Sequence, residues 1–190
     1  HMNIIGIDLA TATGITHLNG DKAYISSINA DRKRYGMQFA AFDAMMTTTL
    51  RTYKTLETIV FFEDIKRHSS TAAAHMYGYY RGALQRICHV QGLECVGIPV
   101  GTVKRIVAEK GNANKLEVAA GCAARIAEQG VSLYYGIEQR SNPTTIESLT
   151  HDESDSLAVA LTGKFMLESG EQIKDSADPS RKVITPVGRC

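Results

Sequence analysis

The chain has 190 residues, of which 44% are hydrophobic and 22% charged, as expected for one globular domain. Its net charge of +1 gives no overall argument for a nucleic-acid-binding protein. No apolar run reaches the roughly 20 residues that span a bilayer, no signal-peptide pattern opens the chain, and the four cysteines lack CxxC spacing, so we expect a cytoplasmic protein with reduced thiols.

Three short strands open the predicted domain. Residues 3–8, 14–18 and 22–28 are rich in β-branched and other apolar side chains, and Asn19-Gly20-Asp21 before the third strand is a strong hairpin signal. The first of these strands ends in an acidic residue, Asp8. We therefore expect three antiparallel strands at the start of the fold.

Buried strands and helices alternate in the rest of the chain. Residues 58–62 and 93–98 are apolar without polar alternation, which is typical of strands covered on both faces. Apolar residues at helical spacing predict helices at residues 36–56, 70–91, 100–109, 115–129 and from 151 onward. Residues 130–150 are polar and read as irregular.

This order of elements predicts an α/β domain. We expect a mixed five-stranded sheet, three antiparallel strands followed by parallel ones, with helices on both faces. The domain should occupy residues 3–168, and residues 169–190 should form a polar and loosely ordered C-terminal tail.

Four acidic residues stand where an unpaired charge is costly. Asp8 and Glu63 end apolar strands, and Asp152 and Asp155 lie three apart at the start of the last predicted helix, on one helix face. Each alone has a plainer explanation, as a turn former or a helix cap. Together they predict a site for divalent metal and metal-dependent phosphodiester chemistry. His151 shares the helix face of Asp155 and is a competing ligand to Asp152.

Basic residues gather at three places, residues 32–34, 66–68 and 104–115, in an otherwise balanced chain. A solvated surface explains any one of these clusters, but beside an acidic metal site they suggest phosphate contacts. Lys115 follows a Gly-Asn-rich loop and begins a predicted helix, which is a natural phosphate position. Three tyrosines next to Arg81 at 77, 79 and 80 either stack on bases or, as is commoner at helical spacing, belong to the core or an interface.

Several motifs in this order resemble the RuvC-like Holliday junction resolvases of the RNase H-like superfamily. Ile5-Gly6-Ile7-Asp8 followed by Gly14 is similar to their first motif, and Phe61-Phe62-Glu63 to their second. Residues 111–115 resemble the stretch that leads to their catalytic lysine, and residues 151–158 resemble their closing motif. Because residues 130–150 are longer than in bacterial members, the chain resembles a phage-type or divergent member, which would act in a host cytoplasm.

The resemblance implies an RNase H-like fold and a homodimeric endonuclease that cuts four-way or other branched DNA in recombination and repair. It implies two Mg²⁺ ions per active site, replaceable by Mn²⁺, with no small-molecule cofactor and no membrane partner. The implied metal ligands are Asp8, Glu63, Asp152 and Asp155, and Lys115 joins them as a catalytic residue. The expected DNA contacts are Lys66, Arg67, Arg81, Lys104, Arg105, Lys110 and Lys115.

Three other functions stay open from the sequence. The same fold could act on RNA–DNA hybrids, or the chain could bind branched DNA without cutting it. The segment Ile5-Gly6-Ile7-Asp8-Leu9-Ala10-Thr11 also resembles the first phosphate loop of ATP-binding actin-like domains, although no glycine-rich adenosine motif accompanies it.

Overall fold

The computed structural model describes residues 3–29, 35–170 and 173–181, and the basic cluster at 32–34 lies outside them. The strands are β1 (Asn3–Asp8), β2 (Ala12–Asn19), β3 (Lys22–Asn29), β4 (Thr58–Asp64), β5 (Glu94–Pro99), β6 (Ser132–Ile137) and β7 (Arg140–Pro143). The helices are α1 (Tyr35–Tyr53), α2 (Thr71–Gln91), α3 (Val100–Ala108), α4 (Lys115–Gln129) and α5 (His151–Glu168), with a 3₁₀ turn η1 (Ile146–Ser148) before α5. None of the helices in the described ranges has the length and apolar character needed to cross a bilayer.

All the strands form one mixed sheet in the order β5-β4-β1-β2-β3-β6-β7. As predicted, β1, β2 and β3 pair antiparallel, and β4 and β5 continue the sheet parallel to β1. The predicted strand number of five is wrong, because residues 130–150 are not irregular but contribute β6 and β7. β6 pairs parallel with β3 and turns back into β7 at the sheet edge. The side chains of β6 are mostly exposed or half-buried, so the sequence has no apolar pattern there. The strand forms because it pairs with β3.

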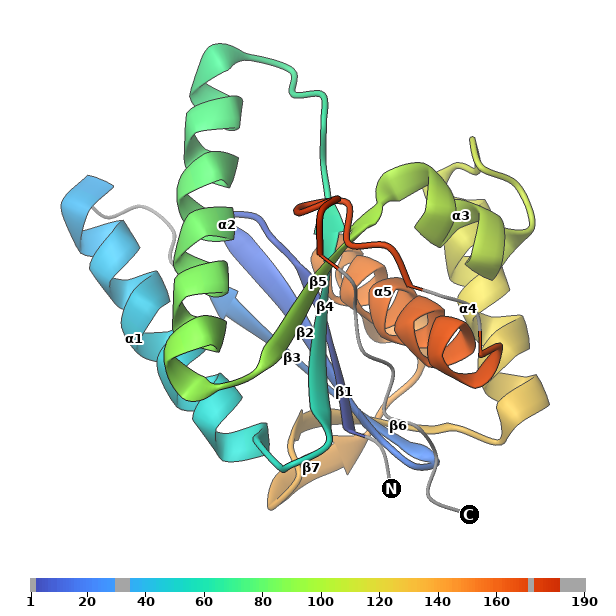
Figure 1. Ribbon diagram of the computed structural model, residues 1–190. Helices are drawn as coiled ribbons and strands as arrows, with labels where there is room; N and C mark the ends of the chain where they lie inside the picture. Colours follow the sequence, from blue (N-terminus) through green and yellow to red (C-terminus); the bar gives the residue numbers. More distant parts are fainter. Residues whose placement is uncertain (1–2, 30–34, 171–172, 182–190) are drawn as a thin grey trace.

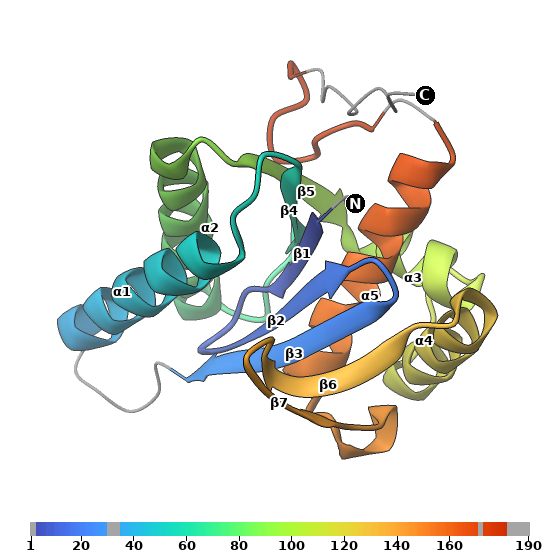
Figure 2. The ribbon, with the colours of Figure 1, turned by 90° about the horizontal axis from the view of Figure 1, so that it is seen from below.

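Helices cover both faces of the sheet, as predicted (Figures 1 and 2). Helices α1 and α2 lie on one face, and α3, α4 and α5 on the other. Strand side chains alternate between the two cores: Ile59 and Phe61 of β4 belong to the α5 side, whereas Val60 and Phe62 belong to the α1–α2 side. The alternation determines which face each side chain at the end of a strand reaches.

Helix α5 packs unusually close to the first two strands, because β1 and β2 carry glycine where the helix crosses them. A Cβ at Gly6 would lie 2.4 Å from the Ser156 carbonyl oxygen, and a Cβ at Gly14 would lie 1.9 Å from that of Asp152. A buried hydrogen bond of 2.9 Å between Thr16 Oγ1 and Ser156 Oγ adds a polar contact across the same interface. The first turn of α5 is thereby held against the end of β1 and the start of β2.

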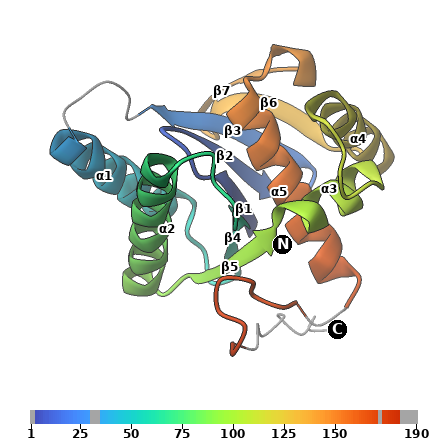
Figure 3. The same cartoon turned by 90° about the horizontal axis from the view of Figure 1, so that it is seen from above.

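Residues 173–181 pack against the edge of the sheet at β5, so the expected loose order does not hold for this part of the tail (Figure 3). Ile173 and Asp175 are 1% and 2% exposed. The Asp175 carboxylate accepts a hydrogen bond from the Gly97 backbone amide, and Arg181 donates to the Cys95 carbonyl. The segment is held by polar contacts with the backbone of an edge strand, and the spacing of apolar residues in the sequence does not predict such contacts.

Candidate functional site

The site begins where β1 and β4 end side by side. β1 pairs parallel with β4 so that Gly6 lies opposite Phe61 and Ile7 opposite Phe62, which brings Asp8 next to Glu63. By strand alternation Glu63 follows Phe61 onto the α5 side, whereas Asp64 follows Phe62 to the opposite side. Asp8 and Glu63 therefore lie at the ends of adjacent strands, and Asp64 faces away from them.

The first turn of α5 brings the other two acids to the same place. Asp8 is paired with Gly14 across the sheet, and Gly14 is in direct contact with the Asp152 backbone. A reciprocal cap begins the helix: the Glu153 amide donates to the Thr150 hydroxyl, and the Glu153 carboxylate accepts from the Thr150 amide at 2.9 Å. Asp152 and Asp155 project from this capped turn, where the positive end of the helix dipole favours carboxylates.

The capping pair is a functional feature that our sequence analysis missed. Thr150 and Glu153 match the spacing of a capping box, Thr-x-x-Glu before an apolar run, so a signal was present. Glu153 is only 2% exposed and its carboxylate is used by the cap. It therefore positions the acidic turn rather than joining the candidate ligands.

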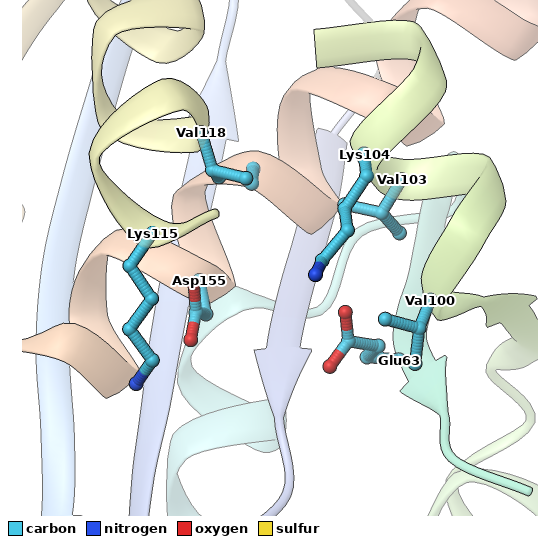
Figure 4. Close-up of a pocket in the computed structure, with 8 residues that line it drawn as sticks. Glu63, Val100, Val103, Lys104, Lys115, Val118 and Asp155 are labelled. Carbon is cyan, nitrogen blue, oxygen red and sulfur yellow. The ribbon is translucent and has the colours of Figure 1, made fainter. Parts of the chain in front are cut away.

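A pocket of about 190 Å³ opens between β4, α3, α4 and α5. Figure 4 shows the Glu63 and Asp155 carboxylates in this pocket with two lysines, the Lys104 ammonium directed at Glu63 and the Lys115 ammonium beside Asp155. The remaining lining residues are apolar: Val100, Val103, Val118 and Ala158. Carboxylates and cations thus share one half-enclosed space with apolar walls.

Burial and mutual repulsion make the two strand-end carboxylates hard to ionise. Burial raises the pKa of Asp8 to about 8, and the negative charges of Glu63, Asp155 and Asp152 add to the rise, against a smaller lowering by Lys115. Burial also raises the pKa of Glu63 to about 7, helped by Asp155 and opposed by Lys104 and Lys115. The two lysines do not compensate the negative charge of the site.

Asp155 shows the same imbalance. Burial raises the pKa of Asp155 above its ordinary value, and Asp152 raises it further, although Lys115, His151 and Lys104 act in the opposite direction. His151 is exposed and faces a neighbouring groove rather than the pocket that holds Glu63. Asp152 raises the pKa of both Asp8 and Asp155, as expected of a member of the acidic group.

The four carboxylates suit a hard divalent cation by their chemistry. Every donor is an oxygen, and the half-buried acids lack enough positive charge around them, which a divalent cation would supply. Within the described part of the chain, no three His, Cys, Asp or Glu side chains form a ready-made metal-binding group. Repulsion among the negative charges keeps the four carboxylates apart when no cation is bound, so their side chains would have to turn inward around an ion.

The predicted DNA-binding residues fall into different environments. Lys104 and Lys115 line the pocket. Lys66 donates to the Ser176 carbonyl at 2.9 Å and Arg81 donates to the Ala177 carbonyl at 3.1 Å, so both hold the C-terminal segment. The other three predicted contacts are on the surface, Arg67 and Arg105 exposed and Lys110 paired with Glu117 at 2.8 Å.

The tyrosines of α2 belong to the core, which favours the plainer of their two interpretations. Tyr77 and Tyr80 are 7% and 1% exposed, and the Tyr79 ring stacks on Phe39 at 3.7 Å. The Tyr77 hydroxyl donates to the Glu63 carbonyl at 2.8 Å and accepts from the Ile65 amide. It therefore fixes the backbone at the end of β4 from the opposite face of the sheet.

No protein-family model matches the sequence, and a search of curated proteins gives no match. Among solved structures, the chain is similar to Thermus thermophilus RuvC in complex with a Holliday junction substrate, with 21% identity and a TM-score of 0.65 over 90% of this chain and 97% of that one. A second Thermus thermophilus RuvC structure matches with 19% identity and a TM-score of 0.65, over 89% and 97% of the two chains. At this identity the likeness establishes the fold, which is RuvC-like and RNase H-like as predicted.

Proposed function

We propose that this protein is a metal-dependent endonuclease that resolves four-way DNA junctions and other branched DNA. The observation that carries the proposal is the convergence of Asp8, Glu63, Asp152 and Asp155 at one end of the sheet, with Lys104 and Lys115 beside them. The solved structure with this fold that is named above was obtained with a Holliday junction substrate. A protein that only bound DNA would gain nothing from uncompensated acids facing phosphate.

The charged side chains of the site have separate roles in phosphodiester hydrolysis. The four carboxylates would hold two Mg²⁺ ions, or Mn²⁺ in their place, with Asp8 central between β4 and α5. When bound, these ions supply charge neutralisation at the phosphate and activation of the attacking water. Lys115 at the start of α4 contacts the phosphate and stabilises the charge that develops on it. The Lys104 ammonium points toward Glu63 and offsets part of the negative charge of that carboxylate.

A homodimer accounts for an exposed face of α2. Gly78 and Gly82 lie four residues apart on this helix, and a Cβ at either position would meet no atom within 4 Å in the described structure. Two such helices from two copies could approach closely. A two-fold dimer would place one active site on each of two opposed strands of a four-way junction, which matches the symmetry of paired nicking.

Digestion of four substrates side by side tests the proposal: a synthetic four-way junction, a flap, an RNA–DNA hybrid and a linear duplex, each with Mg²⁺, with Mn²⁺ and with EDTA. We expect paired nicks in the junction that need the divalent ion, slower cutting of the flap and none of the linear duplex. Preferential digestion of the hybrid would replace this function with an RNase H activity. An intact junction in both metals would refute the proposal.

A further inference from the structure

A second cavity adjoins the candidate site on the far side of Lys115. It has a volume of about 290 Å³ and lies between α4, the turn η1 and the start of α5. Lys115 and Asp155 line both this groove and the pocket that holds Glu63, so the two spaces meet at these side chains. A phosphate held at Lys115 would therefore have the groove immediately beside it.

The groove has a flat apolar side and a polar rim. Leu116, Ala119, Ala120 and Ala123 of α4 form the apolar side, and Leu116 is 82% exposed. The facing segment adds apolar Ile146 and Leu149, together with Thr150, Ser154 and Glu147, which carry hydrogen-bonding groups. Small side chains along one helix face leave room for a thin planar group, while the opposite rim can bond to its edge.

The groove is much larger than a simple ion would fill. At about 30 Å³ for each water molecule, its volume corresponds to roughly ten waters. A nucleobase has the matching properties, apolar faces that gain from leaving water and a polar edge that needs partners. It is also joined through its sugar to the phosphate that Lys115 would contact.

We infer that this groove binds the nucleoside next to the scissile phosphate in the DNA strand being cut. The inference rests on the proposed function and adds a specificity subsite to it. A base unstacked into the groove would pack on Leu116 and the α4 alanines. Its sugar would bring the phosphate between Lys115 and Asp155, so the groove would align the strand as well as select the base.

Fluorescent base substitution tests this without cleavage. 2-Aminopurine is placed at each nucleotide flanking the cut in a four-way junction, and binding is followed with the metal-free protein. At one of these positions we expect fluorescence to rise as the base leaves the stack. Ala120→Phe fills the groove and should remove the rise, whereas Ala124→Phe, an exposed alanine of α4 outside the groove, should keep it.

A cleavage experiment checks the same point independently. Ala120→Phe should cut the intact junction about tenfold more slowly than Ala124→Phe, which corresponds to the loss of one stacked base. An abasic site at the responsive nucleotide should bring the two variants within about twofold of each other, because no base then competes with the phenyl ring. Leu116→Ser, a change at the exposed end of the apolar side, should likewise weaken the fluorescence rise.

The outcomes separate the two proposals. If the parent protein cuts junctions but no flanking 2-aminopurine responds, or if Ala120→Phe and Ala124→Phe behave alike, the groove assignment is wrong and the nuclease function stands. If the parent protein cuts no junction in Mg²⁺ or Mn²⁺, the nuclease function and the groove assignment both fall.

Discussion

Glu63 and Asp64 are neighbouring carboxylates at the end of one strand, and the fold treats them in opposite ways. Asp64 has no exposed side-chain surface and is surrounded by donors, with Lys66 Nζ at 2.6 Å, the Ser176 hydroxyl at 2.7 Å and the Arg81 guanidinium at 3.7 Å. Burial alone would raise the pKa of Asp64, but the bonds from Lys66 and Ser176 and the charge of Arg81 outweigh it, and the pKa is lowered. Glu63 faces three more acids and keeps a raised pKa.

The difference separates an acid that serves the fold from one that, under the proposed function, serves chemistry. A carboxylate whose charge is matched by nearby donors stabilises the folded state, as Asp64 does by joining β4, α2 and the C-terminal segment. A group of carboxylates left without matching charge lowers stability until something else supplies it. Burial alone does not separate the two cases, because both kinds of acid lie at the end of the same strand.

The largest expected effect is on cleavage. Asp8→Asn and Glu63→Gln keep the shape of the side chain but remove the charge, and each should slow junction cutting by about a thousandfold, because metal-assisted charge stabilisation is worth several kcal/mol. Single-turnover rates with Mg²⁺ would measure this. Rates within a few fold of the parent protein would show that these acids are not metal ligands. The contrast between Glu63 and Asp64 would then have no functional meaning.

Removing the charge on the other face should affect folding instead. Asp64→Asn should lower the free energy of unfolding by about 3 kcal/mol, at the low end for a broken buried ion pair, because Lys66 is 59% exposed and screened by solvent. Urea unfolding at pH 7 measures the loss. Glu117→Gln, at an ion pair on the surface with Lys110, is a control that should change the free energy of unfolding far less, because solvent screens this pair.

His17 is a buried titratable group that, like the carboxylates of the site, lacks polar partners, but it lies outside the site. Its ring stacks on Tyr53 at 4.2 Å, and neither ring nitrogen has a hydrogen-bond partner within the described residues. Burial lowers the pKa of His17 to about 4 from 6.5, so stability is complete above pH 6.5 and is lost as the pH falls toward 4. The loss should be about 2 to 3 kcal/mol, and His17→Phe should remove this part of the acid sensitivity in unfolding curves from pH 7 to pH 4.

The smallest expected effect is on the pH dependence of stability, and it tests whether the negative charge of Asp8 is left without a nearby positive charge. The raised pKa of Asp8, about 8 against 3.8, means that its contribution to stability is complete below pH 4 and lost as the pH rises through 8. Without divalent metal, Asp8→Asn should therefore be about 1 to 2 kcal/mol more stable than the parent protein at pH 9 and no more stable at pH 3.5. Mg²⁺ should raise the melting temperature of the parent protein more at pH 8 than at pH 5. Equal stability of parent and variant at pH 9 would contradict this account.

Much of the site followed from local sequence. Strand ends locate Asp8 and Glu63, and period-two alternation turns Asp64 to the opposite face, because both depend only on residues close in the chain. The pairing of β1 with β4 that brings Asp8 beside Glu63 joins segments far apart in the chain. The helix at 115–129 and its start at Lys115 followed from apolar spacing and a preceding turn. By contrast, the partners of Lys66 and Arg81 come from the C-terminal segment, more than 90 residues away, and no local pattern reports such a contact. β6 escaped prediction for the same reason, since its partner β3 lies over 100 residues earlier.

The contact of Gly14 with the Asp152 backbone has a mechanical consequence. No side chain lies between Gly14 and the first turn of α5. The distance between the Asp8 and Asp152 backbones is therefore set by direct backbone contacts, with no side-chain torsion between them. Thermal motion of side chains in the core should leave this spacing unchanged, whereas a change in the twist of the β1–β2 hairpin would alter it at once. Strain introduced at the distant turn between β2 and β3, Asn19-Gly20-Asp21, should therefore reach the acidic site along β2.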